Sequence, residues 1–363
     1  MPTNSQLLLG PGSLTLAQAH LLSLFFATTY VGFLYISKQS RLSFIKPTKP
    51  ISTVSSPENY RTTNVNTTLN RSPDDLKPRG KQRNERWRDD EDVIRARLVA
   101  CVVSTLVCCA TVLGVHYVLL SNLQRYKNRG VADRLLDALT LTLSRLGLFN
   151  ATSITRIQLW ALLFPKPHLI TPILYSGTLY SMYLSQTLPF MYFWSFYCDV
   201  QLKFWSWQGI RNYITAPITE ELVFRACVLA VYHLAGLERN KMIWLTPLSF
   251  GLAHVHHAWE TFNIYGRNRT AAKRAILVTC VQLTYTTLFG AYCTYLFLRT
   301  GSLFPPISAH AFCNVMGIPE IGEEMGNFPK RKYLIVVAYI AGIYAFATKL
   351  GPWTKSDHSI YWT

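Results

Sequence analysis

Long apolar stretches separated by polar and charged segments dominate the chain. Five of them approach the roughly 20 residues that a helix needs to cross the hydrocarbon core of a bilayer. They cover residues 13–36, 97–120, 168–198, 274–298 and 332–349, and shorter or proline-interrupted runs lie at 157–166, 221–236, 241–258 and 303–317. Because every backbone amide in lipid must be satisfied within its own segment, this pattern predicts an all-α, polytopic membrane helix bundle with about seven to eight transmembrane helices.

Composition divides the chain into four parts. Residues 1–36 are predicted to form a retained N-terminal membrane anchor, because this run lacks the basic start and the cleavage site of a signal peptide. Residues 37–96 are rich in Ser, Thr, Asn and Pro and hold 13 Lys/Arg against 8 Asp/Glu, which is typical of a disordered segment. Residues 97–350 are predicted to be the membrane core, and 351–363 a C-terminal tail.

The distribution of basic residues predicts how the chain is oriented. The positive-inside rule places residues 37–96 in the cytosol and the nearly uncharged residues 1–12 across the membrane. Residues 121–156 are also basic, with six Lys/Arg against two Asp. Two consecutive loops cannot both be cytosolic if the helix between them crosses fully. Either one loop breaks the rule, or part of 97–156 lies on the membrane.

Charge and cysteine content narrow the class of protein. Only 15% of residues are charged, against about 25% in soluble domains. The net charge of +17 is therefore interpreted as attraction to anionic membrane lipids, and no nucleic-acid partner is expected because no basic–aromatic motif is present. The eight cysteines lie in apolar segments without CxxC spacing, which predicts free, buried thiols.

Ionisable residues recur at helical spacing in and beside the apolar runs, where such side chains are costly and usually functional. In TEELVFR, Glu221 and Arg225 stand four residues apart with the acid first, the favourable order for an ion pair. We therefore expect Glu221 to be structural and Glu220 to be free to act as a general base. Pro217 predicts that a helix begins just before the two glutamates. The alternative is a helix start at the membrane surface with solvated carboxylates.

A second cluster lies in SFGLAH. Phe250 and His254 are four residues apart, which places an aromatic ring and an imidazole on one helical face. The ring would fix the imidazole and exclude water from it. His256 and His257 follow but do not share that spacing, so they are interpreted as interface residues.

A third cluster, in SAHAFCN, repeats the four-residue spacing with His310 and Asn314. The preceding Pro305 and Pro306 predict the start of the helix that carries them. An imidazole and an amide on one face supply two donors toward a common point, as a developing oxyanion requires. The alternative is a pair of hydrogen bonds between membrane helices.

The three motifs EExxxR, FxxxH and HxxxN closely resemble those of the type II CAAX prenyl endopeptidases, the Rce1-like branch of the CPBP/ABI intramembrane proteases. The resemblance covers about residues 150–350, and the strings APITEELVFRAC and SAHAFCNVMGIP resemble its eukaryotic members. It implies a multi-pass protein of the endoplasmic reticulum membrane whose active site is accessible from the cytosolic side. Such enzymes remove the aaX tripeptide from prenylated CaaX proteins, among them Ras-like and Rho-like small GTPases and mating-pheromone precursors.

The resemblance also implies a role for each motif residue. The implied catalytic residues are Glu220, His254, His310 and Asn314, and the implied supporting residues are Glu221, Arg225 and Phe250. On this basis Glu220 and His254 activate the attacking water, and His310 and Asn314 hold the oxyanion.

Two alternatives to this mechanism follow from the same residues. No cofactor is expected, although one carboxylate and two imidazoles would also make an open zinc site. The rival function is a non-catalytic membrane scaffold or an ion- or proton-coupled transporter, in which Glu220 and the histidines form a path. Asn314 favours hydrolysis, because a proton path has no need of an amide one helical turn beyond His310.

Overall fold

The structure is a computed structural model that describes residues 9–45, 78–148, 165–357 and 359–362. Within these ranges every regular element is a helix, and the only β-type pairing is an isolated antiparallel bridge between Ser43 and Arg86. The predicted all-α class is confirmed.

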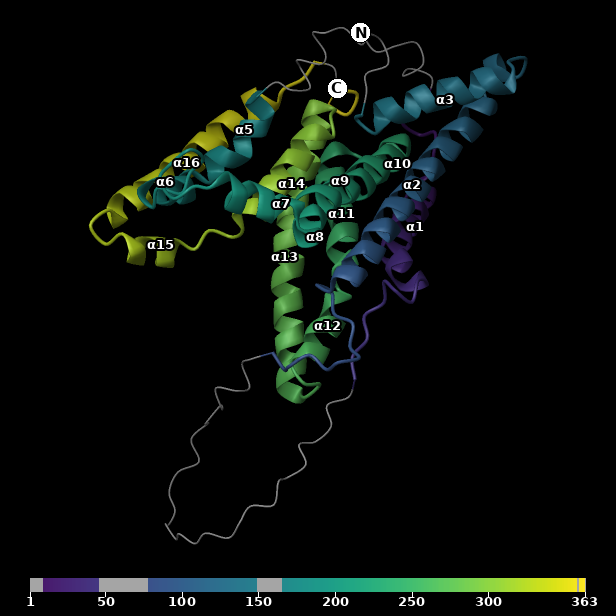
Figure 1. Ribbon diagram of the computed structural model, residues 1–363. Coiled ribbons are helices and arrows are strands. Elements are labelled where there is room, and N and C mark those ends of the chain that lie inside the picture. The colour runs from purple at the N-terminus through teal and green to yellow at the C-terminus, as the bar shows by residue number, and fades with distance from the viewer. Residues whose placement is uncertain (1–8, 46–77, 149–164, 358, 363) are drawn as a thin grey trace.

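Four of the described helices are long and apolar enough to cross a membrane. They are α1 (Leu16–Ile36), α2 (Glu91–Ser121), α13 (Arg269–Thr300) and α16 (Lys332–Thr354). Each coincides with one of the predicted long apolar runs, and exposed apolar side chains such as Leu106, Leu277 and Ile340 line their outer faces. Figure 1 shows α1 and α2 side by side on one flank, α13 through the middle, and α16 with α5 and α6 on the other flank. The chain is therefore treated as a multi-pass membrane protein.

Outside residues 196–234, the other described helices are shorter than these four. They are α3 (Val131–Arg145), α5 (Pro165–Leu174), α6 (Ser176–Leu184), α11 (Arg239–Ala253), α12 (His257–Ile264), α14 (Phe304–Met316) and α15 (Ile321–Asn327), with a 3₁₀ turn at Gln124–Tyr126. The 15 residues of α3 span about 22 Å, too short to cross a hydrocarbon core of about 30 Å. This agrees with the alternative in which part of 97–156 lies on the membrane. The number of seven to eight transmembrane helices stays a prediction.

The apolar run 168–198 is not one helix, contrary to the prediction. Helix α5 ends at Leu174 and α6 begins at Ser176, and the interruption falls at Tyr175, whose backbone N–H donates to the carbonyl of Pro172 at 3.1 Å. Pro172, lying inside α5, has no N–H of its own and restricts the helix around it. Hydrophobicity along the run therefore overstated its length as a span.

A helix of mixed α and π geometry carries the EExxxR motif. The chain between α6 and α11 forms η3 (Phe196–Leu202), α7 (Lys203–Trp205), α8 (Trp207–Gly209), η4 (Ile210–Thr215), α9 (Ala216–Glu221), η5 (Leu222–Cys227) and α10 (Val228–Leu234), where η3, η4 and η5 are π-helical. Trp207–Leu234 is continuous and is called the composite helix below. The prediction that a helix begins at Pro217 is therefore wrong, because Pro217 lies inside the composite helix.

The described ends of the predicted linker 37–96 fold against the bundle. Arg79 donates from Nε to the carbonyl of Asn263 in α12 at 2.9 Å. Helix α2 already begins at Glu91, so the predicted boundary at residue 96 falls inside a helix. Residues 46–77, with the disorder predicted for them, lie outside the described residues, as does most of the apolar run 157–166.

All eight cysteines are free. Four of them are buried, as predicted, whereas Cys198 and Cys280 are exposed. Cys280 lies on α13, one of the membrane-length helices. Its exposure is consistent with a thiol that faces the apolar surroundings of the bundle rather than its interior.

Candidate active site

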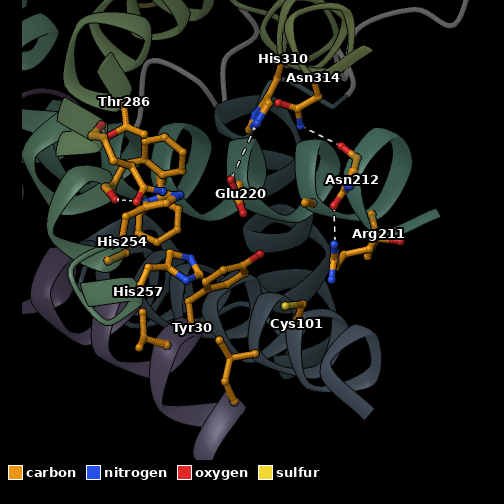
Figure 2. Close-up of a pocket in the computed structure, with 18 of the residues that line it drawn as sticks. Tyr30, Cys101, Arg211, Asn212, Glu220, His254, His257, Thr286, His310 and Asn314 are labelled. Carbon is orange, nitrogen blue, oxygen red and sulfur yellow. Dashed lines mark hydrogen bonds and ion pairs between the residues drawn. The ribbon is translucent and has the colours of Figure 1, made fainter. Parts of the chain in front are cut away.

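A cavity of about 470 Å³ opens between α1, α2, the composite helix, α11, α13 and α14 (Figure 2). All four residues predicted to be catalytic line it: Glu220, His254, His310 and Asn314. These four residues come from three separate segments of the chain. The fold therefore brings together side chains that are up to 94 residues apart in the sequence. Phe250 also lines the cavity, while Glu221 and Arg225 are fully buried behind its wall.

Glu221 links two of the motifs. Its Oε1 atom lies 2.7 Å from Nδ1 of His310, and its Oε2 atom lies 3.2 Å from Nε of Arg225. The second contact is the ion pair that the four-residue spacing predicts. Because both partners of that pair are completely buried, each charge depends on the other for stabilisation. Glu221 thus ties the composite helix to α14 and orients the His310 ring.

Phe250 covers the other side of the buried arginine. The guanidinium carbon of Arg225 lies 4.2 Å from the centre of the Phe250 ring, within the range of a cation–π interaction. Space for the guanidinium comes from Gly290 of α13, where an added Cβ would lie 3.1 Å from Arg225 Nη2 and 2.8 Å from Pro247 Cβ. Phe250 therefore contacts both the buried Arg225 guanidinium and the His254 ring, the second of which the four-residue spacing predicted.

The hydrogen bond of His254 determines which of its two ring nitrogens carries the proton and which is left as an acceptor. Nδ1 lies 2.8 Å from the backbone carbonyl of Phe250. A carbonyl only accepts, so Nδ1 carries the proton, and Nε2 of the neutral ring is left as an acceptor. The Phe250 ring packs edge-on against the imidazole with centroids 4.6 Å apart. His254 can therefore accept a proton at Nε2.

His310 differs from His254 in its partners. Its Nδ1 faces the Glu221 carboxylate at 2.7 Å, and its Nε2 lies 3.8 Å from Oε2 of Glu220. With Nδ1–H donating to Glu221, Nε2 is a donor only when the imidazole is protonated. The 3.8 Å separation from Glu220 exceeds a hydrogen bond, and Figure 2 shows the two side chains facing each other across the cavity.

Asn314 is held by a hydrogen bond that Pro217 makes possible. In the π-helical turn, Ala216 N–H donates to the carbonyl of Arg211, five residues earlier. The next carbonyl in this series, that of Asn212, would require an N–H from Pro217, which proline lacks. Asn314 Nδ2 donates to this carbonyl at 2.7 Å instead. The amide has a second N–H, so the anchor fixes the group without using its full donor capacity.

The structure adds residues to the cavity wall that the sequence analysis did not select. Tyr30 of α1 reaches the composite helix, where its hydroxyl lies 2.8 Å from Oγ1 of Thr219, the neighbour of Glu220. His256 and His257 also line the cavity. They were set aside on helical spacing, but α11 ends at Ala253 and the chain turns there. A single tyrosine in an apolar run gives no signal that would have identified Tyr30.

No group of three or more His, Cys, Asp or Glu side chains within the described ranges is arranged to hold a metal ion. Glu220 and His310 approach each other to 3.8 Å. A zinc ion bound here would need Glu220, His254 and His310 as its ligands.

The part of the chain that carries the three motifs matches a known protein family. The family model for "Type II CAAX prenyl endopeptidase Rce1-like" matches residues 202–316, which include all seven predicted site residues. The predicted resemblance to the Rce1-like endopeptidases is confirmed. The match begins beside the composite helix and ends with α14, so it contains the three motifs but neither α1 nor α2.

Curated relatives agree with the family match. Residues of this chain are 43% identical over 145 residues to "CAAX prenyl protease 2" of Arabidopsis thaliana, covering 40% of this chain and 44% of that protein. They are 48% identical over 117 residues to "Probable CAAX prenyl protease 2" of Schizosaccharomyces pombe, covering 32% and 42%. The human "CAAX prenyl protease 2" is 36% identical over 209 residues, covering 54% and 58%. The chain thus spans about half the length of these relatives. No solved structure matches it significantly.

Proposed function

We propose that the protein is an intramembrane endopeptidase that removes the aaX tripeptide from prenylated CaaX proteins. The observation that carries this proposal is the convergence of Glu220, His254, His310 and Asn314 on one cavity in a membrane helix bundle. The similarity to relatives named as CAAX prenyl proteases supports the same reaction class. No observation favours the transporter alternative.

The geometry supports a mechanism in which Glu220 and His254 activate water. Glu220 Oε2 or His254 Nε2 takes a proton from water, and the water oxygen forms a bond to the carbonyl carbon of the prenylated cysteine. The electron pair of the carbonyl moves onto its oxygen. When this tetrahedral intermediate collapses, the C–N bond breaks, and the proton passes to the leaving amine of the tripeptide.

His310 and Asn314 are assigned to the oxyanion. Protonated His310 donates from Nε2 while Glu221 accepts from Nδ1, so the imidazolium is oriented and its charge balanced. Asn314 donates through the N–H that is not bound to Asn212. Glu221 and Arg225 act as supporting residues because they lie behind the cavity wall.

Substrates and location follow as parts of the proposal. The apolar cavity between membrane helices suits a lipid-modified peptide, with Ras-like and Rho-like small GTPases and mating-pheromone precursors as the expected substrates. We place the protein in the endoplasmic reticulum membrane with the site open to the cytosol, on the side of the basic residues 37–96. Contact with anionic lipids would follow from the net charge of +17.

The test is cleavage of a prenylated CaaX peptide by the purified full-length protein, followed by mass spectrometry of both products. We expect release of the intact tripeptide and no cleavage of the same peptide without its prenyl group. The Glu220→Gln protein serves as the control for contaminating proteases. Absence of tripeptide release from a folded preparation with bound lipid would reject the proposal.

Metal dependence is tested on the same preparation. We propose that the reaction needs no cofactor, so exhaustive chelation should leave the rate within about two-fold, far less than the effect of losing a catalytic group. Stoichiometric bound zinc, with activity lost on its removal and restored on its return, would recast Glu220, His254 and His310 as ligands.

A further inference from the structure

Arg97 is a buried arginine with no carboxylate partner within hydrogen-bond distance among the described residues. It lies on α2, lines the cavity and is only 6% exposed. Its Nε donates to the backbone carbonyl of Ser40 at 2.9 Å, whereas its Nη2 is buried and has no partner in the part of the chain that the structure describes. A buried guanidinium group with unused donors is costly, so this position calls for an anion.

Arg97 lies one helical turn along α2 from Cys101, a cavity-lining residue near Glu220. Cys101 and Tyr30 line the cavity next to Thr219 and Glu220. From Cys101 to Arg97 is one turn of α2, or about 6 Å along the helix axis. On α1, Leu34 is one turn beyond Tyr30 and also lines the cavity. Arg97 also donates to the carbonyl of Ser40, just past the end of α1. The step from Cys101 to Arg97 on α2 and the step from Tyr30 to Leu34 on α1 therefore lead toward the same end of the cavity.

Two further arginines line this end of the cavity. Arg88 and Arg211 are both cavity-lining residues. Arg211 Nη1 donates to the carbonyl of Arg88 at 3.1 Å, and its Nη2 contacts Asp89 at 2.9 Å. Arg88 Nε lies 3.8 Å from the Glu260 carboxylate. Among the described residues named here, three arginines share two carboxylates, Asp89 and Glu260, so this end of the cavity has a net positive charge.

We propose that Arg97, with Arg88 beside it, binds the free α-carboxylate at the C-terminus of the substrate. This inference rests on the proposed function and specifies how the substrate is positioned. A guanidinium group presents paired N–H donors that match a carboxylate. The unused Nη2 donor of Arg97 is satisfied by this anion, and the surplus positive charge is balanced by it.

The length of the leaving tripeptide sets how far its carboxylate lies from the cleaved bond. Three extended residues reach about 10 Å. A substrate with its scissile carbonyl between Glu220 and His310 would extend its C-terminus past Tyr30 toward the turn of α2 that carries Arg97, because all these residues line one cavity. Binding of the terminal carboxylate by Arg97 would fix how many residues separate the C-terminus from the cleaved bond. The site would therefore release three residues and reject internal sequences that lack a terminal charge.

The inference is tested with two prenylated CaaX peptides that differ only in their last group, a free carboxylate or a carboxamide. We expect wild-type kcat/KM to be about 10- to 100-fold higher for the free acid, as is typical for losing one charged hydrogen-bonded contact. Equal kcat/KM values for acid and amide would overturn the inference while leaving the proposed function intact. Cleavage of neither peptide would reject the proposed function itself, and the inference with it.

Variants of Arg97 and Arg88 test whether the preference for the free acid depends on these two arginines. In Arg97→Gln the acid-to-amide ratio should fall toward 1, and in Arg97→Lys it should be partly kept. Arg95→Gln is the matched control, because Arg95 lies on the same helix but is exposed and paired with Glu91, and it should keep the wild-type ratio. Arg88→Gln, whose side chain is 42% exposed, provides a second variant that is less prone to misfold. A wild-type ratio in both Arg97→Gln and Arg88→Gln would assign the carboxylate to another group and overturn the inference.

Discussion

At the scale of single residues, the adjacent glutamates Glu220 and Glu221 have different surroundings and should respond differently to the same change. Glu220→Gln keeps the shape of the side chain but removes its basicity, so cleavage should be abolished while the protein stays folded. Glu221→Gln removes the charge that balances Arg225 and His310. It should cost about 3–5 kcal/mol of stability, as is usual when one partner of a buried pair is lost. Peptide cleavage and thermal unfolding in detergent measure the two effects.

The reverse pattern would exchange the two roles. A stable but inactive Glu221→Gln protein, together with an active Glu220→Gln protein, would make Glu221 the general base. Glu323→Gln, which changes an acidic residue on the separate short helix α15, is a suitable control because α15 does not line the cavity.

His254, His310 and Asn314 have different hydrogen-bond partners, so their substitution should have different effects on turnover. His254→Ala and His310→Ala should each abolish turnover, because each imidazole transfers or donates a proton. Asn314→Ala should reduce kcat by an amount equivalent to roughly 2.7–4 kcal/mol of barrier, the range for one lost oxyanion donor. Measuring kcat and KM separately distinguishes this from weaker substrate binding. An Asn314→Ala protein with normal kcat and raised KM would make Asn314 a binding residue.

Helical spacing predicted some contacts of the site well and could not predict others. The pairs Glu221–Arg225 and Phe250–His254 form within one turn, so the sequence determines them locally. The contact between Glu221 and His310 joins residues 89 positions apart, and it depends on how α14 packs. Arg97 did stand at the start of an apolar run, where a charge is unusual, but its neighbours there gave no sign of the cavity.

At the scale of elements, the composite helix shows why local rules for proline failed. Pro217 removes one N–H from the helix, which normally favours a first turn. Here the missing donor comes from Asn314 on another helix, so the helix continues through the proline. A sequence pattern cannot reveal a donor that tertiary packing supplies. The π-helical turns on both sides of α9 are likewise typical of functional sites.

The short polar segment before α2 is held by one carboxylate. Glu85 accepts from Arg79 Nη1 at 2.9 Å, from Gln82 N–H at 3.0 Å and from Ile45 N–H at 2.8 Å. Burial opposes ionisation, but hydrogen bonds from Arg79, Gln82 and Ile45 lower the pKa of Glu85 to about 2. Glu85 therefore joins residues on both sides of the segment 46–77 in one contact.

This contact predicts a pH dependence. The pKa of Glu85 falls from 4.5 to about 2 on folding, so its contribution to stability is fully present above pH 4.5 and is lost as the pH falls toward 2. Limited proteolysis of the region before α2 should therefore accelerate between about pH 4.5 and 2. Glu85→Gln should be cleaved readily throughout and show a weaker pH dependence.

Glu91→Gln is the matched control for the acid titration. Glu91 also pairs with an arginine, Arg95, but both side chains are more than half exposed, so its pair adds little stability. It should follow the wild-type curve. An unchanged curve for Glu85→Gln would show that the segment is held by other contacts.

At the scale of the whole molecule, the matched family segment supplies the motifs but not the complete cavity. Residues 202–316 carry every motif residue, whereas Tyr30 comes from α1 and Arg97 from α2. The spans predicted from hydrophobicity therefore do more than anchor the protein. Their overall positions follow from apolar length, but the cavity they enclose depends on packing between segments far apart in the sequence.

The C-terminal tail packs against helices α3, α10 and α13. Tyr361 is 4% exposed, and its hydroxyl donates to the carbonyl of Arg145 at 2.5 Å. Its ring packs against Phe297 of α13 and His233 of α10, with centroids 5.4 and 4.9 Å apart. Ser359 donates to the carbonyl of Leu298 at 2.6 Å. The tail thus contacts α3, α10 and α13 through residues that do not line the cavity.

Removal of this contact should destabilise the protein without altering the chemistry. Tyr361→Ala should cost about 3–5 kcal/mol, the usual range for truncating a large buried aromatic side chain. Thermal unfolding in detergent should shift to lower temperature, and activity should disappear earlier after preincubation at rising temperatures. At a temperature where both proteins are folded, KM should stay unchanged because Tyr361 does not line the cavity. Lys355→Ala, at a side chain that is 68% exposed, should unfold like wild type. If Tyr361→Ala unfolded at the wild-type temperature, the tail would contribute nothing to holding α3, α10 and α13 together.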